Sequence, residues 1–256
     1  MASCLNFKAA TALALVIGLP GTQATAQSAG DLVQAETVAS SQSITIRRFP
    51  SVYGAPSAFA GAPNAGFVGL SYVSKGGNAN GDIAAGYTFG NAVEAVSVTG
   101  TLVISDLDDF ADSGNLNMAL SRLVAESSRS LTFVGATVND LAGWGKTGDA
   151  SYRVYASHIF TVGDLNDEFP MQVTFGYGDT AKAVKGKASE GGFFGGVGVG
   201  LTANLGVSAS FTESQVNAGV SFGIPQVPGL GMSIGVSDIG ENVGDRTTFL
   251  SLGYGF

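Results

Sequence analysis

The last seven residues of the chain alternate strictly between apolar side chains and small or polar ones. The apolar phase is Leu250, Leu252, Tyr254 and Phe256, and the other phase is Ser251, Gly253 and Gly255. A period of two places each phase on one face of a β-strand. One face of this strand is therefore wholly apolar and aromatic, and it needs either a protein core or lipid to cover it.

The same alternation recurs through the second half of the chain. The runs cover residues 171–177, 196–201, 205–212, 216–224, 230–237 and 250–256. In each run the apolar residues alternate with Gly, Ser, Thr, Gln or Asn. Six such runs in succession predict a series of antiparallel strands that share one apolar surface.

The first half continues the pattern less regularly. Strands are predicted near residues 68–72, 85–89, 96–104, 116–120, 130–139 and 151–161, which makes twelve when counted from Gly66. The stretch from Asn115 to Glu126 could instead be an amphipathic helix, because Leu116, Leu120 and Leu123 would share a helical face. The spacing of the neighbouring strands favours a strand there.

The alternating runs and the terminal aromatic residue resemble bacterial outer-membrane β-barrels, over residues 64–256. The resemblance implies an all-β fold, an antiparallel transmembrane β-barrel of about 12 strands with an N-terminal periplasmic or lumenal segment. It implies the outer membrane as location, and membrane lipid and lipopolysaccharide as contacts. It also implies that periplasmic chaperones deliver the chain and that the insertion machinery reads Tyr254 and Phe256.

The N-terminus is typical of a secretory signal peptide. Lys8 supplies a positive charge before the apolar run Ala9–Leu19, and Ala24 and Ala26 form a small-x-small cleavage pattern. A run of about eleven residues is shorter than the ~20 that a membrane-spanning helix needs. We therefore expect a signal peptide at 1–26, an N-terminal segment at 27–63 and a barrel at 64–256. Cys4 would leave with the signal, so the mature chain would contain no disulfide.

The charge balance narrows the possible partners. Removing Lys8 from 12 basic residues leaves 11 against 20 acidic ones, a net charge near −9, which argues against nucleic-acid binding. Charged residues make up 12% of the chain, about half the usual ~25%, while the 38 glycines are roughly twice the usual ~7%. This composition suits a membrane barrel better than a water-soluble domain.

If the apolar phase faces lipid, the other phase lines the lumen. From residue 196 onward that lining is almost entirely Gly and Ser, with Thr212, Asn217 and Phe249 as exceptions. The predicted pore-lining residues of larger size are Asp82, Glu94, Asn115, Asn117, Arg153, Tyr155 and Gln172. One interpretation places Arg153 opposite Asp82 or Glu94 across the lumen, where the charges would produce a transverse field.

The half of the wall that is rich in glycine and serine allows two interpretations. Glycine in a strand often marks the close approach of another backbone, so residues 27–62 could fold against this half as a plug. Alternatively the glycines only ease the curvature of the strands. The sequence leaves both interpretations open.

Asp106, Asp108, Asp109 and Asp112 cluster in one predicted outer loop. Several oxygen ligands from one short loop suit a hard cation such as calcium. The loop lacks the glycine and the closing glutamate of an EF-hand, so a solvated acidic loop, bridged by divalent ions to lipopolysaccharide, is the favoured interpretation. No metal or other cofactor is expected.

His158 is the only histidine, and a barrel phospholipase would need a Ser–His pair on the lipid-facing wall. The residue two positions further on is Phe160 rather than serine, which argues against an enzyme. We therefore expect a porin-like channel for small solutes. The alternatives are a structural or adhesive surface protein anchored by the barrel, and a translocator-type barrel with an N-terminal segment through the pore.

Overall fold

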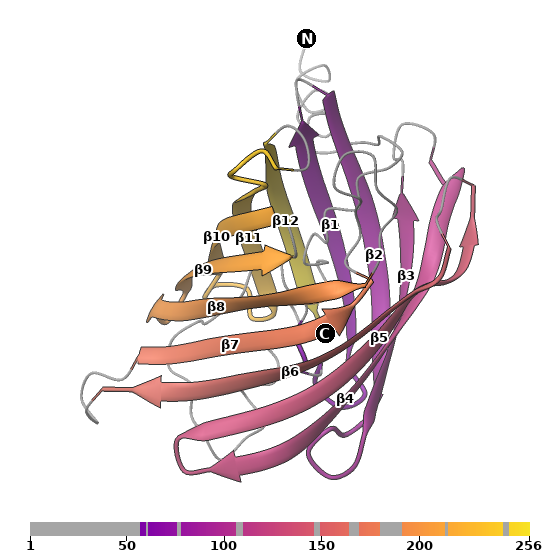
Figure 1. Ribbon diagram of the computed structural model, residues 1–256. Coiled ribbons are helices and arrows are strands. Elements are labelled where there is room, and N and C mark those ends of the chain that lie inside the picture. Colours follow the sequence, from indigo (N-terminus) through magenta and orange to yellow (C-terminus); the bar gives the residue numbers. More distant parts are fainter. Residues whose placement is uncertain are drawn as a thin grey trace.

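The computed structural model describes residues 57–59, 61–75, 78–105, 110–145, 149–163, 169–179, 191–212, 215–242 and 246–256. These residues form a closed barrel of twelve antiparallel strands (Figure 1). The strands are β1 Gly66–Lys75, β2 Asn78–Gly90, β3 Ser97–Ser105, β4 Ser113–Ser127, β5 Ser130–Trp144, β6 Ser151–Val162, β7 Phe169–Gly178, β8 Gly192–Thr202, β9 Leu205–Thr212, β10 Gln215–Gly223, β11 Leu230–Ser237 and β12 Thr247–Gly255. The predicted all-β barrel of twelve strands is confirmed, and the ambiguous stretch 115–126 is strand within β4.

Each strand pairs with its neighbour in the chain, and β1 pairs with β12 to close the barrel. The closing register runs from Phe67 opposite Gly255 to Lys75 opposite Thr247. Closure removes the free sheet edges that hydrocarbon could not satisfy with hydrogen bonds. In the described part of the chain, no helix is long and apolar enough to cross a bilayer.

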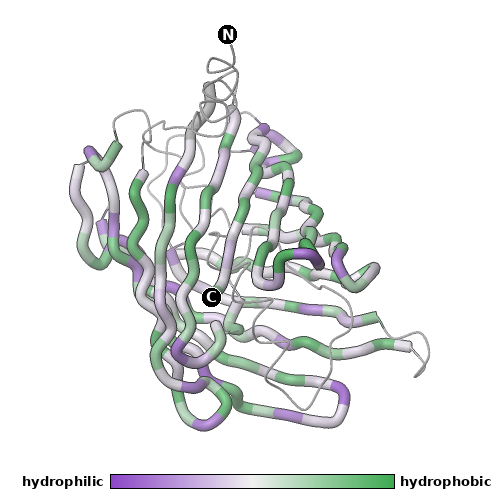
Figure 2. Tube along the Cα trace, turned by 180° about the vertical axis from the view of Figure 1, so that it is seen from behind, coloured by the Kyte–Doolittle hydropathy of each residue, from purple (hydrophilic) through white to green (hydrophobic). Residues whose placement is uncertain are grey.

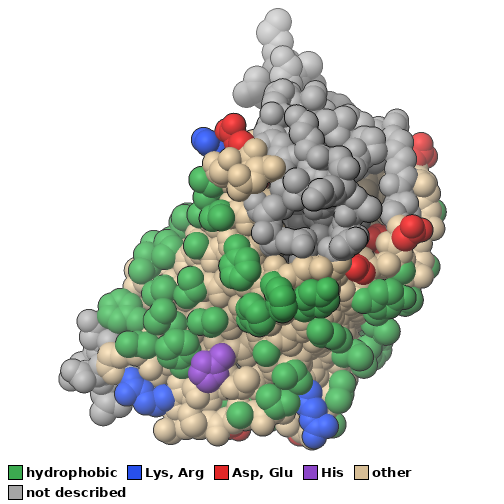
Figure 3. Space-filling model, in the orientation of Figure 1, with side chains coloured by type: hydrophobic (Ala, Val, Ile, Leu, Met, Phe, Trp, Pro, Cys, Tyr) green, Lys and Arg blue, Asp and Glu red, His purple; other side chains and the backbone are tan. Residues whose placement is uncertain are grey.

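The two faces of the barrel wall differ in chemistry. Hydrophobic and hydrophilic residues interleave along the strands (Figure 2), and hydrophobic side chains cover much of the outer surface (Figure 3). Large apolar residues such as Phe175 and Phe193 are more than half exposed, whereas inward residues such as Ser221 and Ser233 are buried. An exposed apolar band on a closed barrel is the surface that lipid covers.

The connections divide into a short-turn end and a loop end of the barrel. The β2–β3, β4–β5, β6–β7, β8–β9 and β10–β11 connections leave the strands at the short-turn end, where Gly66 and Phe256 also lie. The other six connections leave the strands at the opposite end, the loop end. β1 and β2 stay paired as far as Lys75 opposite Asn78.

Inside the barrel, aromatic rings lie over glycines of the neighbouring strand. Phe194 of β8 is opposite Gly176 of β7, and Tyr155 of β6 is opposite Gly135 of β5. A Cβ at Gly176 would overlap the Phe194 ring and would lie 2.6 Å from both Tyr155 Cβ and the Val154 carbonyl oxygen. The glycines therefore provide the space in which the lumenal rings pack.

We expect Gly176→Ala to destabilise the barrel by ~1–3 kcal/mol, the usual cost of overpacking a filled interior. Gly100→Ala on β3 is the matched control, because a Cβ there meets nothing within 4 Å. Urea unfolding in lipid vesicles, followed by heat-modifiable mobility on a gel, measures both variants. Equal midpoints for the two variants would contradict the close packing over Gly176.

Candidate functional site

The lumenal wall formed by β8 to β12 is neutral and built from small residues. These five strands contain no charged residue. Their inward positions carry glycine and hydroxyl side chains for the most part, with Ser233 and Ser251 hydrogen-bonded to each other at 2.8 Å. Asn217 donates to Ser210 Oγ at 3.2 Å. This glycine–serine wall, as we call β8–β12, confirms the small-residue lining predicted after residue 196.

The wall formed by β4 to β7 carries apolar side chains that point inward. The buried cluster consists of Ala58, Phe59, Ala92, Leu131, Phe133, Tyr155, Ile159 and Phe194, and Leu123 packs against it. Phe133 is 1% exposed and Phe194 0%. Inward rings this well covered need a partner in the lumen, and Phe59 is one: its ring meets Phe133 edge-on with centroids 5.2 Å apart.

Three residues that precede β1 are bound inside the barrel, and we call Ser57–Phe59 the lumenal anchor. The Ala58 amide donates to Ser157 Oγ at 2.8 Å, and Ser121 Oγ donates to the Ala58 carbonyl oxygen. Gln172 Nε2 donates to Ser57 Oγ at 3.0 Å. Both backbone polar groups of Ala58 are thus satisfied by side chains of the wall, as a buried backbone requires.

The position of the anchor bears on the two interpretations of the glycine-rich half. One of them placed residues 27–62 against that half of the lumen, whereas the described residues Ser57–Phe59 contact β4 to β7 on the other side. The physical reason is that this side offers side chains long enough to reach the anchor and an apolar surface for Phe59. Residues 27–56 and 60 lie outside the described residues.

Two of the predicted pore-lining residues lie at the anchor. Gln172 is 1% exposed and holds Ser57. Tyr155 is buried, its ring lies beside Gly135, and its hydroxyl is hydrogen-bonded to Thr137 Oγ1. The structure therefore brings these two residues together around Ser57–Phe59.

Asn115 and Asn117 lie around a buried carboxylate that the sequence did not single out. Asn115 Nδ2 donates to Asp140 Oδ1 at 2.6 Å, and the Asp140 amide donates to Asn117 Oδ1 at 2.9 Å. Asp140 is 6% exposed and has a positive φ of 54°. It lies where the β4–β5 register shifts, between Leu116 and Met118, so these polar contacts hold a bulge at the loop end.

The same arrangement recurs between β10 and β11. The Asp238 amide donates to Asn217 Oδ1 at 3.2 Å, and Asp238 is 2% exposed with a φ of 54°. The β4–β5 and β10–β11 pairs lie six strands apart in a ring of twelve. Asp140 and Asp238 therefore place buried carboxylates on opposite walls of the lumen.

The charged residues predicted for the lumen lie at different depths. Arg153 is buried near the start of β6, and its Nε donates to the Asp179 carbonyl oxygen at 2.9 Å. Ser71 Oγ of β1 donates to Asp82 Oδ2 at 3.4 Å. Glu94 lies in the exposed β2–β3 turn at the short-turn end. Because Arg153 lies near the loop end and Glu94 at the short-turn end, Arg153 and Glu94 do not face each other across the lumen.

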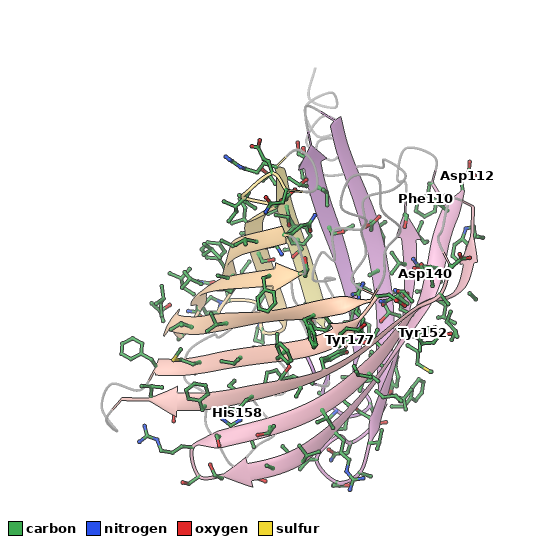
Figure 4. All side chains as sticks on the ribbon, in the orientation of Figure 1. Phe110, Asp112, Asp140, Tyr152, His158 and Tyr177 are labelled. Atoms are coloured by element: carbon green, nitrogen blue, oxygen red, sulfur yellow. The ribbon has the colours of Figure 1, made fainter. Side chains whose placement is uncertain are left out.

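The remaining candidates that the structure describes lie on the outside of the barrel or beyond its ends. Asp106, Asp108 and Asp109 lie outside the described residues, while Asp112 is exposed beyond the loop end of β4 (Figure 4). Within the described ranges, no group of three or more His, Cys, Asp or Glu could hold a metal ion. Tyr254 faces outward, with its ring centroid 6.1 Å from that of Phe256.

His158 lies on the outer face of β6 toward the short-turn end (Figure 4). Its Nδ1 is hydrogen-bonded to Thr132 Oγ1 at 2.8 Å, and its ring stacks on Phe160 at 5.2 Å. The neighbouring hydroxyl therefore belongs to a threonine on the adjacent strand.

Sequence reasoning did not identify Ser121, Phe133 and Ser157, which hold the anchor. One signal was available. Two adjacent apolar residues interrupt the alternation at Ile159–Phe160 and again at Phe193–Phe194. Paired apolar residues of this kind indicate that both faces of a strand are covered. The three polar contacts of Ala58 and Ser57 had no signal of their own.

No protein-family model matches the chain, and no curated protein matches it in sequence. Among solved structures, the KdgM porin aligns with a TM-score of 0.50 over 74% of this chain and 99% of that one, at 9% identity. The chain has the fold of an outer-membrane β-barrel. Its fold and apolar exterior confirm the predicted outer-membrane location.

Weaker likenesses extend to other outer-membrane barrels. Omp33 of Acinetobacter baumannii has a TM-score of 0.48 over 76% of this chain and 98% of that one, at 11% identity. Outer membrane phospholipase A of Escherichia coli has a TM-score of 0.46 over 89% and 97%, also at 11% identity. At such identities the likeness concerns the fold alone.

We expect a disulfide to join the anchor to the wall in Ala58→Cys/Gly135→Cys. An ideal Cβ at Gly135 lies 3.3 Å from Ala58 Cα, so the two thiols come within reach of each other once the Tyr155 ring, 2.8 Å from that Cβ, moves aside. Mild oxidation and intact mass before and after reduction measure it. Ala58→Cys/Gly100→Cys is the control, because Gly100 lies in the outward phase of β3, and its thiols should stay free. Thiols that remain equally free in both variants would contradict the anchor.

Proposed function

We propose that this outer-membrane β-barrel is a porin-like channel through which small solutes diffuse passively, and that it catalyses no reaction. The observation that carries the proposal is the glycine–serine wall. Five consecutive strands present hydroxyl groups and glycine backbone to the lumen, without a charged residue and with Phe194 and Phe249 as the large apolar residues. Such a surface is wettable and binds no solute tightly.

The width of the barrel supports a path for solutes. About eight strands enclose an interior that side chains just fill, and the diameter grows roughly linearly with strand number. Twelve strands lined on one side by Gly and Ser leave more room than this. The lumenal anchor occupies the opposite side, against β4 to β7, so we place the solute path along β8 to β12.

We further propose that residues 1–26 are a signal peptide, that 27–63 continue the lumenal segment, and that the insertion machinery reads Tyr254 and Phe256. Supporting the last point, Phe256 is 68% exposed and its backbone is fixed by Gly66 at the closing seam. Its ring is thus presented to the outside at a fixed position.

Two alternatives have observations in their favour. The bound anchor narrows the lumen, which would suit a barrel that serves only as a surface anchor, or a translocator with its segment in the pore. Catalysis at His158 would need a serine hydroxyl beside its ring. Against catalysis, His158 contacts a threonine on β5 and has Phe160 two residues further on.

The folded protein is expected to produce stepwise, ohmic current in planar lipid bilayers, because a water-wettable lumen crosses the membrane. Folded barrels that insert but carry no current would favour the surface-anchor alternative. Phospholipid hydrolysis that disappears in His158→Ala would replace the channel with an enzyme.

Weakening the anchor should raise the conductance. Phe59→Ala removes a buried ring worth ~2 kcal/mol, which corresponds to about a thirtyfold fall in the equilibrium constant between the bound and the released anchor. We expect higher and noisier single-channel current, with a larger increase on deleting residues 27–62. Phe89→Ala is the matched control, because Phe89 is 58% exposed on the outside. Unchanged conductance in the deletion variant would show that the segment does not narrow the pore.

A further inference from the structure

The lipid-facing surface is interrupted by basic side chains at one place. Among the described strand residues that face outward, Arg122 of β4 and His158 of β6 are the two with an ionisable nitrogen. Both lie near the short-turn end of their strands. In Figure 3 the histidine lies among hydrophobic side chains, with basic residues toward the same end of the barrel.

The register places the two residues on one patch of the exterior. Arg122 is opposite Val134 of β5, and Val134 is opposite Ala156 of β6. His158 lies two residues further toward the short turns. Strand spacing and rise put their Cα atoms roughly 12 Å apart, with a single strand between them.

A third basic side chain, that of Arg129, is fixed beside them. Arg129, in the β4–β5 turn, donates from Nε to Thr161 Oγ1 at 3.3 Å and from Nη2 to the Gly163 carbonyl oxygen at 2.6 Å. These contacts hold its exposed guanidinium across the ends of β5 and β6. Among the described residues, the exposed carboxylates at this end of the barrel are Glu94, in the β2–β3 turn, and Glu126, at the end of β4.

The guanidinium of Arg122 in particular lacks an anionic partner among the described residues. It has no hydrogen-bond or ion-pair partner within the part of the chain that the structure describes, and it is exposed beside Leu120 and Val124. A cation on the lipid face is costly at the bilayer midplane and is tolerated near the interface. A guanidinium there matches a phosphate through paired N–H donors.

We infer that Arg122, Arg129 and His158 form a binding site for the phosphate headgroup of an anionic phospholipid in the periplasmic leaflet. The short-turn end of such barrels is periplasmic, and that leaflet is made of phospholipid. The acyl chains would lie on the exposed apolar side chains of Leu120, Val124 and Val134. The inference rests on the outer-membrane location and not on conduction, so it can fail or succeed independently of the channel.

The test is lipid selectivity. The refolded barrel in nanodiscs of equimolar phosphatidylglycerol and phosphatidylcholine is released into detergent, and the lipids that remain bound are identified by native mass spectrometry. We expect phosphatidylglycerol to be enriched on the wild type. Arg122→Gln should lower that enrichment roughly fivefold, as expected for loss of one surface cation, and adding His158→Gln should lower it further.

The matched control is Arg246→Gln at the loop end, where Arg246 pairs with Glu241 at 3.3 Å. Its lipid ratio should equal that of the wild type, and heat-modifiable mobility confirms that each variant is folded. If Arg122→Gln does not fold, Arg129→Gln in the turn replaces it. Equal enrichment in all variants, or an equal loss in the control, would overturn the inference.

Discussion

The structure depends on satisfying every backbone hydrogen bond without water. In hydrocarbon an unpaired N–H or C=O costs several kcal/mol, so a sheet is stable there only when its first and last strands pair. The seam between β1 and β12 meets this requirement as far as the last residue. Gly66 and Phe256 exchange reciprocal hydrogen bonds of 2.9 Å, and the Phe256 ring lies over Gly66, where a side chain would collide with it.

Closure by the backbone leaves the two faces of the wall free to differ. The outer face is mostly apolar because lipid is its solvent. The inner face is divided into a neutral glycine–serine wall and a wall with inward rings such as Phe133. Those rings would be unfavourable against water, and Phe59 covers part of them by returning into the lumen. The anchor is thus the consequence of an apolar patch on an otherwise polar inner wall.

The alternation in sequence was enough to predict the strands, their number and the outward phase, because these follow from the two-residue period and from lipid as solvent. It was not enough to predict the contacts within the lumen. Ser57 and Gln172 are 115 residues apart, and Ala58 and Ser157 are 99 apart, and no local pattern records such pairs. The bulge at Asp140 was missed for a related reason, since its positive φ depends on Asn117 of the facing strand.

Backbone and side chains hold different parts of this structure. The ladder that closes the barrel involves main-chain atoms, whereas the anchor is held by the side chains of Ser121, Phe133, Ser157 and Gln172. Losing the anchor would therefore leave every strand pairing intact. The contents of the lumen can change while the barrel remains closed, so pore width in this fold is set by a few side-chain contacts rather than by the sheet itself.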